Sequence, residues 1–484
     1  MQKQKVASSL ALKFVENFLA KGMGLVISIL LARLISPDDF GQLAIITVFI
    51  NLSYSFIHSG LSQALVQKKD VDDLDYSTVF YISLTIAVIL TIVLILVAPF
   101  IGNWYKSSSL VAPLRFYAIS LLFGAFNSIQ SAKMQKEMQF KNLLISRIIT
   151  VFLSGAIGVF AAYKGMGLWA LVIYNFSVTV IGCLAHFIYC KWIPKLAFST
   201  KRAKGLFNYG WKILVSGLLF SLYSDLRTII IGKKYSTEDL GYYDRGKQVP
   251  TIFATTIDGA VQGVMFPTMA SVQDQKEQVR AILKRTLTLG ALIIIPFMAG
   301  LALLTRPFIS VFYGDKWLPA TFFMQVYCIT EMLVPLYSST QIVIKALGRS
   351  DIYMKLEVVR RIASITVLLI AVFGFNSLNA IAISMAIGGL IDYILVTIPV
   401  KKLLGYGFFQ QVFDIWKIIL ATAIMSAVVY LVGFIQIHAI LLMLVQAVIG
   451  VAVYVLAIVV LREKNFFYLL NSAKEMLNKK KESN

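Results

Sequence analysis

Residues 32–41 read ARLISPDDFG and residues 232–241 read GKKYSTEDLG, so the two stretches align at an offset of 200 residues. In this alignment Asp39 matches Asp239 and Gly41 matches Gly241. Three more matches follow in the same order: APFIGNWY (98–105) with RPFISVFY (306–313), FYAIS (116–120) with VYCIT (326–330), and Lys141 and Arg147 with Lys355 and Arg361. The offset drifts slowly, as small loop insertions would cause. Four matches in order indicate an internal duplication.

The composition of the 484-residue chain is that of a membrane protein. Apolar residues make up 58% of the chain and charged residues only 14%, whereas soluble domains have about 45–50% and about 25%. This difference excludes an ordinary soluble enzyme, a nucleic-acid-binding domain and a disordered scaffold. A spanning helix needs roughly 20 mostly apolar residues, so the chain has room for at most about fourteen spans.

The hydrophobic runs predict an all-α polytopic membrane protein with fourteen transmembrane helices. The runs lie near residues 10–34, 41–66, 78–101, 113–133, 143–163, 168–190, 208–232, 248–270, 286–305, 319–344, 356–375, 378–400, 414–435 and 439–461. Spans 1–6 and 7–12 are the two copies, and both begin on the same side because six is even, so the repeats are parallel. The predicted domains are residues 1–205, residues 206–403, two added helices in residues 404–462, and a basic tail of residues 463–484.

The basic residues predict the orientation. With both termini in the cytoplasm, 27 of the 45 Lys and Arg lie in cytoplasmic segments and 8 in outer loops, which follows the positive-inside rule. The net charge of +21 therefore reflects topology rather than nucleic-acid binding. The three Cys and three His indicate no disulfide framework and no metal site. The acidic run DVDDLD (70–75) is typical of helix capping or solvation.

Two polar stripes occupy equivalent helices of the two copies. Asn51, Ser55, His58 and Ser62 have the spacing i, i+4, i+7, i+11, which puts them on one helical face. Thr251, Thr255, Asp258 and Gln262 repeat this spacing 200 residues later. Ordinary hydrogen bonding between packed helices is one explanation. We favour the lining of a cavity, because polar and charged groups in a membrane usually face a bundle interior or a water-filled space.

Further ionisable residues lie within the predicted spans. Span 1 carries Lys13, Glu16, Asn17 and Lys21, and span 7 carries Lys212, Asp225 and Arg227. For Lys13 and Lys212, snorkelling to the interface is an equal alternative. Arg147, Arg360 and Arg361 begin outward-running helices, so interfacial anchoring is expected for them. Glu331 and Asp392 are acids inside spans, and they either couple transport to an ion or pair with nearby cations.

Five segments resemble a known family. LARLISPDDFGQLAI (31–45), GLSQALVQKK (60–69), PKLAFS (194–199), GYYDRG (241–246) and FPTMASVQDQ (266–275) are similar to Wzx-type polysaccharide flippases. The nearest group is the colanic-acid-exporter-like branch of the multidrug/oligosaccharidyl-lipid/polysaccharide exporter superfamily. The resemblance covers roughly residues 5–400. One departure is His58, where the family frequently has an acidic residue.

The resemblance implies a fold and an activity. The fold would be a V-shaped transporter of two six-helix lobes, with spans 1, 2, 7 and 8 lining a central cavity. The activity would be that of a flippase rather than an enzyme, without a cofactor, in the bacterial cytoplasmic membrane. It would turn over a polyprenyl-pyrophosphate-linked oligosaccharide for O-antigen, capsule or exopolysaccharide synthesis, with polymerase or assembly proteins as possible partners. Flipping of a lipid-linked peptidoglycan precursor and cation-coupled multidrug antiport are the alternatives.

These implications assign hypothetical roles to the polar residues in the spans. Cations would hold the pyrophosphate, namely Lys13, Lys21, Lys212 and Arg227. Neutral groups would contact the sugars, namely Asn17, Asn51, Ser55, His58, Thr251, Thr255 and Gln262. Acids would couple transport to H⁺ or Na⁺, namely Glu16, Asp225, Asp258, Glu331 and Asp392. The membrane potential is an alternative drive, because moving two negative charges outward gains roughly 4.6 kcal/mol at 100 mV.

Overall fold

The computed structural model describes residues 21–58, 60–68, 70–435, 437–467 and 471, and all regular secondary structure in this part of the chain is helical. Residues 21–34 form the first described helix. The elements that follow are α2 (Pro37–His58), α3 (Leu61–Gln67), α4 (Asp73–Trp104), η1 (Ser108–Leu110), α5 (Val111–Ala118), α6 (Ser120–Lys136), α7 (Phe140–Tyr163), α8 (Leu168–Cys190), α9 (Thr200–Lys234), α10 (Thr237–Ala270), α11 (Lys276–Phe312), η2 (Asp315–Trp317), α12 (Ala320–Met332), α13 (Val334–Ala346), α14 (Ser350–Ile370), η3 (Ala371–Phe375), α15 (Leu378–Leu404), α16 (Phe408–Val432) and α17 (Ala439–Val460).

Helix is the form these apolar runs must take in a bilayer. α4 shows this well, because its middle is rich in β-branched Ile, Val and Thr, which favour strands in water. In hydrocarbon every backbone N–H and C=O needs a partner, and a helix supplies one within the segment itself. The helix begins at a capping box, in which the Asp72 carboxylate accepts a hydrogen bond from the Asp75 N–H and the Asp75 carboxylate accepts one from the Asp72 N–H.

Twelve segments in the described part of the chain are long and apolar enough to cross a membrane, which confirms an all-α multi-pass protein. The other two predicted spans are not among the twelve. The run at residues 10–34 lies partly outside the described residues. The run at 248–270 lies in α10, which is 34 residues long, or about 51 Å at 1.5 Å per residue, but carries many polar side chains. The count of fourteen therefore stays a prediction.

The order of the elements confirms the duplication. α4, η1, α5, α6, α7 and α8 are followed, after α9 and α10, by α11, η2, α12, α13, α14 and α15 in the same order, and the second series adds η3 between its last two helices. Both series start with a long helix that has a proline near its end, Pro99 in α4 and Pro307 in α11. Both then continue through a short 3₁₀ turn into a helix that is broken in the middle. The matched segments APFIGNWY and RPFISVFY are the ends of the two long helices.

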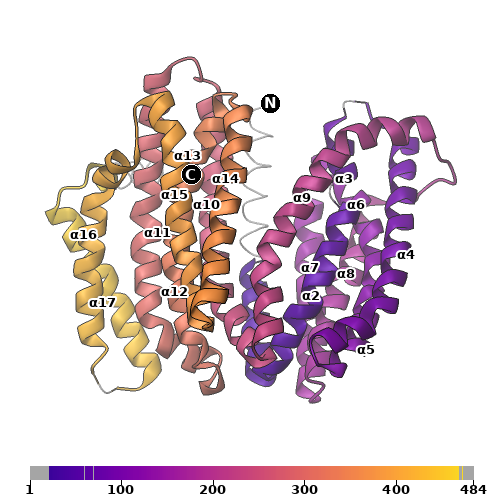
Figure 1. The fold of residues 1–484 in the computed structure, drawn as a ribbon, viewed down its shortest axis with the longest axis horizontal. Helices are drawn as coiled ribbons and strands as arrows, with labels where there is room; N and C mark the ends of the chain where they lie inside the picture. Colours follow the sequence, from indigo (N-terminus) through magenta and orange to yellow (C-terminus); the bar gives the residue numbers. More distant parts are fainter. Residues whose placement is uncertain (1–20, 59, 69, 436, 468–470, 472–484) are drawn as a thin grey trace, which may run out of the picture. The chain divides into compact units, whose positions relative to one another are not determined.

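The contacts divide the chain into two compact units, Met1–Asp244 and Arg245–Asn484. In the first unit α9 packs along α2, α3 and α4. In the second unit the two added helices α16 and α17 pack against α11, beside which they lie in Figure 1, and the Tyr454 hydroxyl donates to the Leu292 carbonyl over 2.9 Å. The domain limits predicted from the repeat, at residues 205/206, 403/404 and 462/463, remain proposals.

Glycines allow two close backbone contacts within the first unit. A Cβ at Gly41 would overlap the carbonyl of Thr237, and a Cβ at Gly241 would overlap the carbonyl of Pro37. Gly41 and Gly241 are equivalent in the repeat, so the starts of α2 and α10 meet through the same surface of each copy. At the other end of α2, Gly60 has a φ of 89°, and a Cβ there would overlap the carbonyl of Gly210 in α9.

The substitution Gly41→Ala tests this packing. The added methyl group must push α2 away from Thr237, and overpacking of this kind costs about 1–3 kcal/mol. We therefore expect a melting temperature several degrees lower for the purified protein in detergent. Gly300→Ala in α11 is the matched control, because a Cβ there meets no atom within 4 Å. Equal melting temperatures for the two variants would contradict the close contact.

Candidate functional site

Three members of the polar stripe of the first unit lie on α2, but the expected single helical face is wrong for Ser62, because the helix breaks at Gly60 and Ser62 is buried in α3. Asn51 is exposed, whereas Ser55 and His58 are half-buried. The Ser55 hydroxyl donates to the Asn51 carbonyl over 3.0 Å. The imidazole of His58 stacks on Tyr54, with ring centroids 5.2 Å apart, and the Tyr54 hydroxyl donates to the Ser120 carbonyl over 3.3 Å. The His58 side chain is therefore held by an aromatic ring of its own helix.

The predicted cations of the first unit differ in burial. Arg227 in α9 is only 5% exposed, and its Nε is buried without a hydrogen-bond partner in the described part of the chain. Lys21 and Asp225 are half-buried. A guanidinium at this depth with unused donor capacity can bind an anion. Four further candidates cannot be placed: Lys13, Glu16 and Asn17 lie outside the described residues, as does the side chain of Lys212.

The second unit brings several predicted residues together. The Thr251 hydroxyl of α10 donates to a Glu331 Oε of α12 over 2.7 Å, and Glu331 is 7% exposed. Two turns further along α10, Asp258 accepts a hydrogen bond over 2.5 Å from the amide of Gln262. Asp258 also accepts a hydrogen bond from the Ser338 hydroxyl of α13. Both carboxylates thus receive hydrogen bonds from neutral groups. Thr255 instead donates to the Thr251 carbonyl over 2.7 Å.

Asp392 pairs with an arginine, and here the expectation for Arg360 is wrong. Arg360 is 3% exposed and donates to Asp392 in α15 and to Glu357 in its own helix, each over 3.0 Å. Its guanidinium also lies over the Tyr337 ring, 5.0 Å from the centroid. An interfacial anchor was expected because the span was predicted to begin near residue 356. α14 begins at Ser350, which places Arg360 about 15 Å along the helix.

Sequence reasoning missed three members of this polar network. Glu357 precedes Arg360 by three residues and Arg361 by four, a spacing that favours ion pairs on a helix and was a usable signal. Ser338 could have been found from the repeat, because it lies 210 residues after Ser128, the offset of FYAIS and VYCIT. In the first unit Ser128 makes a related contact, with Ser62, which is the repeat equivalent of Gln262. Tyr337 had no such signal.

The acidic run at residues 70–75 has the predicted capping role. Asp75 is fully buried and pairs with Lys68 over 2.7 Å. Asp72 pairs with Arg202 of α9, and this hydrogen bond lowers the pKa of Asp72 to about 2. No group of three or more His, Cys, Asp or Glu able to hold a metal ion is found among the described residues. The run therefore ties α3, α4 and α9 together through charge pairs.

Apolar spanning helices with charged groups hydrogen-bonded inside the bundle define a multi-pass membrane protein of the transporter class. Residues 30–322 match the family described as "Polysaccharide biosynthesis protein". The chain belongs to this family.

Relatives and solved structures agree with this assignment. The lipopolysaccharide biosynthesis protein WzxC of Escherichia coli (strain K12) is 22% identical over 86% of this chain and 85% of its own length. The succinoglycan biosynthesis transport protein ExoT of Rhizobium meliloti (strain 1021) is 21% identical over 69% of this chain and 68% of its own length. A structure of the lipid II flippase MurJ in an inward closed conformation superposes with a TM-score of 0.77, at 18% identity, over 94% of this chain and 99% of its own. This last likeness concerns the fold alone.

A double-mutant cycle tests the buried pair. Arg360→Met or Asp392→Ala leaves one charge without its partner, which costs about 3–5 kcal/mol when the pair is buried. The double variant removes both charges, so we expect its loss of unfolding free energy to be clearly smaller than the sum of the two single losses. Denaturant unfolding in detergent measures this.

The exposed pair of Arg349 and Asp351, 2.9 Å apart near the start of the same helix, is the control for this cycle. Exposed ion pairs contribute little to stability, so its cycle should show almost no coupling. Additive losses for Arg360 and Asp392 would contradict a stabilising pair.

Proposed function

We propose that this chain is a flippase that carries a polyprenyl-pyrophosphate-linked oligosaccharide from the cytoplasmic to the outer leaflet by alternating access, for the synthesis of a surface polysaccharide. The family match over residues 30–322 is the observation that carries the proposal. The name of ExoT, a transport protein in succinoglycan synthesis, supports it. The buried polar groups described above fit a transporter better than an enzyme.

The substrate explains why charged side chains inside the bundle are useful. A pyrophosphate and its sugars cannot cross hydrocarbon unaided, because unpaired charges and polar groups are costly there. In our proposal Arg227 and Lys21, with Lys13 and Lys212, hold the pyrophosphate. The stripe residues, among them Asn51 and Thr255, contact sugar hydroxyls. The prenyl chain stays in the lipid throughout.

Ion coupling is the second part of the proposal. Asp258 and Glu331 receive hydrogen bonds from hydroxyl and amide groups, and these neutral donors do not cancel a negative charge. A negative charge held away from water is costly in free energy. Uptake of H⁺ or Na⁺ at either carboxylate would neutralise it. Asp392 is less suited to this role, because Arg360 already compensates it. Asp225 and Glu16 remain further candidates.

The setting follows from the same proposal. The cytoplasmic membrane of a bacterium, with both termini inside, fits the distribution of Lys and Arg. Polymerase or assembly proteins would receive the substrate on the outer side.

A lipid-linked peptidoglycan precursor is the nearest alternative substrate, and complementation distinguishes the two. A strain lacking its polysaccharide flippase should regain its polymer, whereas one lacking its lipid II flippase should not regain growth.

Lys21→Ala and Arg227→Ala test the cationic site. Each substitution removes a charge-assisted hydrogen bond worth about 1.5–3 kcal/mol, so we expect roughly tenfold or greater loss of flipping at limiting substrate. The measurement is the exposure of a lipid-linked oligosaccharide to an external glycosidase in proteoliposomes. Lys164→Ala, an exposed residue after α7, is the matched control. Wild-type rates for both test variants would end the proposal of a cationic site.

Asp258→Asn and Glu331→Gln test ion coupling. The amides keep the shape of the side chains but cannot take up a proton and bind Na⁺ poorly. We expect wild-type flipping to respond to an imposed pH or Na⁺ gradient, and the double variant to lose that response. Asp351→Asn at the exposed start of α14 should keep it. A wild-type rate that follows the membrane potential but ignores both gradients would assign the drive to the potential alone.

A further inference from the structure

The connection between α8 and α9, residues 191–199, is a non-helical segment fastened to α4. The Lys195 N–H donates to the Ser77 hydroxyl over 3.0 Å, and the Ser199 N–H donates to the Thr78 hydroxyl over 3.2 Å. Trp192 is buried and packs edge-on against Tyr76, with ring centroids 6.0 Å apart. The segment is therefore fixed at three points, and its remaining side chains have defined directions.

Three of the remaining side chains are apolar and exposed. Leu196 is 98% exposed, Ile193 65% and Phe198 53%. Exposed apolar groups that lie close together mark a surface that contacts something else. At the end of two membrane-crossing helices, apolar side chains held outward on a fixed backbone are suited to insertion into the interfacial region of a bilayer.

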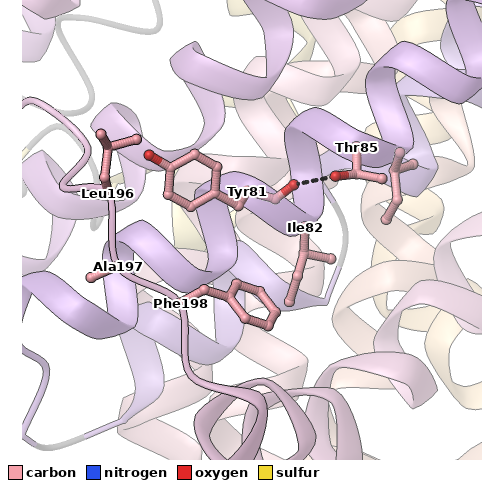
Figure 2. A pocket seen from close by; sticks show the side chains of 7 residues that line it. Tyr81, Ile82, Thr85, Leu196, Ala197 and Phe198 are labelled. Carbon is pink, nitrogen blue, oxygen red and sulfur yellow. Dashed lines mark hydrogen bonds between the residues drawn. The ribbon is translucent and has the colours of Figure 1, made fainter.

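A cavity of about 620 Å³ lies between this segment and the surface of α4. Figure 2 shows its walls: Tyr81, Ile82 and Thr85 on the helix, facing residues 196–198. Only two side-chain hydroxyls line it, and that of Thr85 is used by the Tyr81 carbonyl, over 2.8 Å. The Tyr81 hydroxyl lies toward Leu196 (Figure 2). Such walls suit a hydrocarbon chain with one polar group at its end.

The segment beside the cavity is strongly basic. Residues 191–204 read KWIPKLAFSTKRAK and contain five basic residues and no acidic one. Lys195 adjoins Leu196 in sequence and is 66% exposed, although its ammonium lies 2.7 Å from the Asp73 carboxylate. That ion pair is itself open to water, so it leaves the ammonium accessible to a second anion. The cation therefore lies at the Asp73 end of α4, about 12 Å along the helix from Tyr81 in the cavity wall.

We propose that this cavity binds a phospholipid with an anionic headgroup, such as phosphatidylglycerol, with an acyl chain between α4 and residues 196–198 and the phosphate at Lys195. This inference does not depend on the proposed flippase activity. The occupant is a bilayer lipid rather than the glycolipid substrate, because the walls offer almost no hydrogen-bonding groups for sugars. A single phosphodiester charge also suits a lysine that already shares its charge with a carboxylate.

A fluorescent reporter at position 196 tests the proposal. The three native cysteines are buried, so a bimane label attached to the variant Leu196→Cys reports on this segment. The protein is reconstituted in phosphatidylcholine bilayers that contain an equal share of either brominated phosphatidylglycerol or brominated phosphatidylcholine. We expect at least twofold stronger quenching by the brominated phosphatidylglycerol. Val448→Cys, 68% exposed in α17, is the control and should be quenched equally by both lipids.

Two charge variants in the Leu196→Cys background should change the preference for brominated phosphatidylglycerol in opposite directions. Lys195→Gln removes the cation, so the preference for phosphatidylglycerol should fall to none. Asp73→Asn removes the competing carboxylate, so the preference should rise. Both variants break the same ion pair, so a purely structural effect would change them alike.

Two results would overturn the proposal. Equal quenching by both lipids at position 196 would mean that the segment meets the bilayer without selecting a headgroup. Displacement of the brominated phosphatidylglycerol by added polyprenyl phosphate, but not by unlabelled phosphatidylglycerol, would assign the cavity to the substrate lipid.

Discussion

The second unit depends on one constraint, which is that a charge held away from water must be compensated. Arg360 meets it with two carboxylates at 3.0 Å, one from α15 and one from its own helix, and with the ring of Tyr337 from α13. Since each partner comes from a different place in the chain, compensation of this single guanidinium fixes the positions of α13, α14 and α15 relative to one another. The hydrogen bonds between Arg360 and the two carboxylates depend on distance and angle, so they set the register of α14 against α15 more narrowly than apolar contacts do.

The same constraint separates structural charges from functional ones. Asp392 has a fixed cation as its partner and serves to hold two helices together. Asp258 and Glu331 are instead bound by neutral hydroxyl and amide donors, which leave the negative charge in place for a cation to neutralise. The equivalent of Asp258 in the first copy is His58, which stacks on Tyr54 instead. The two copies have therefore diverged at this helical position. At this position, an acid that suits ion coupling is present in the second unit and a histidine in the first.

The sequence predicts those features that depend on local composition and on the repeat. The helical multi-pass fold follows from the apolar runs. The match between FYAIS and VYCIT predicts that the helix pairs α5–α6 and α12–α13 are equivalent in the two copies. The depth of Arg360 could not be predicted, because hydropathy marks the apolar centre of a span and not the polar turns before it, here Ser350 to Lys355. Pairings such as Thr251 with Glu331 join residues 80 apart and depend on how helices pack, which spacing within one helix does not encode.

The proposed lipid site and the proposed pyrophosphate site are joined by one helix. This helix, α9, follows directly after the segment that contains the lipid site. α9 starts at Thr200, directly after the apolar residues 196–198, and runs unbroken to Lys234. Its first turn is fixed by Arg202 pairing with Asp72, and Arg227 lies seven turns further along. The proposed lipid site and the buried cation therefore lie at opposite ends of one continuous helix.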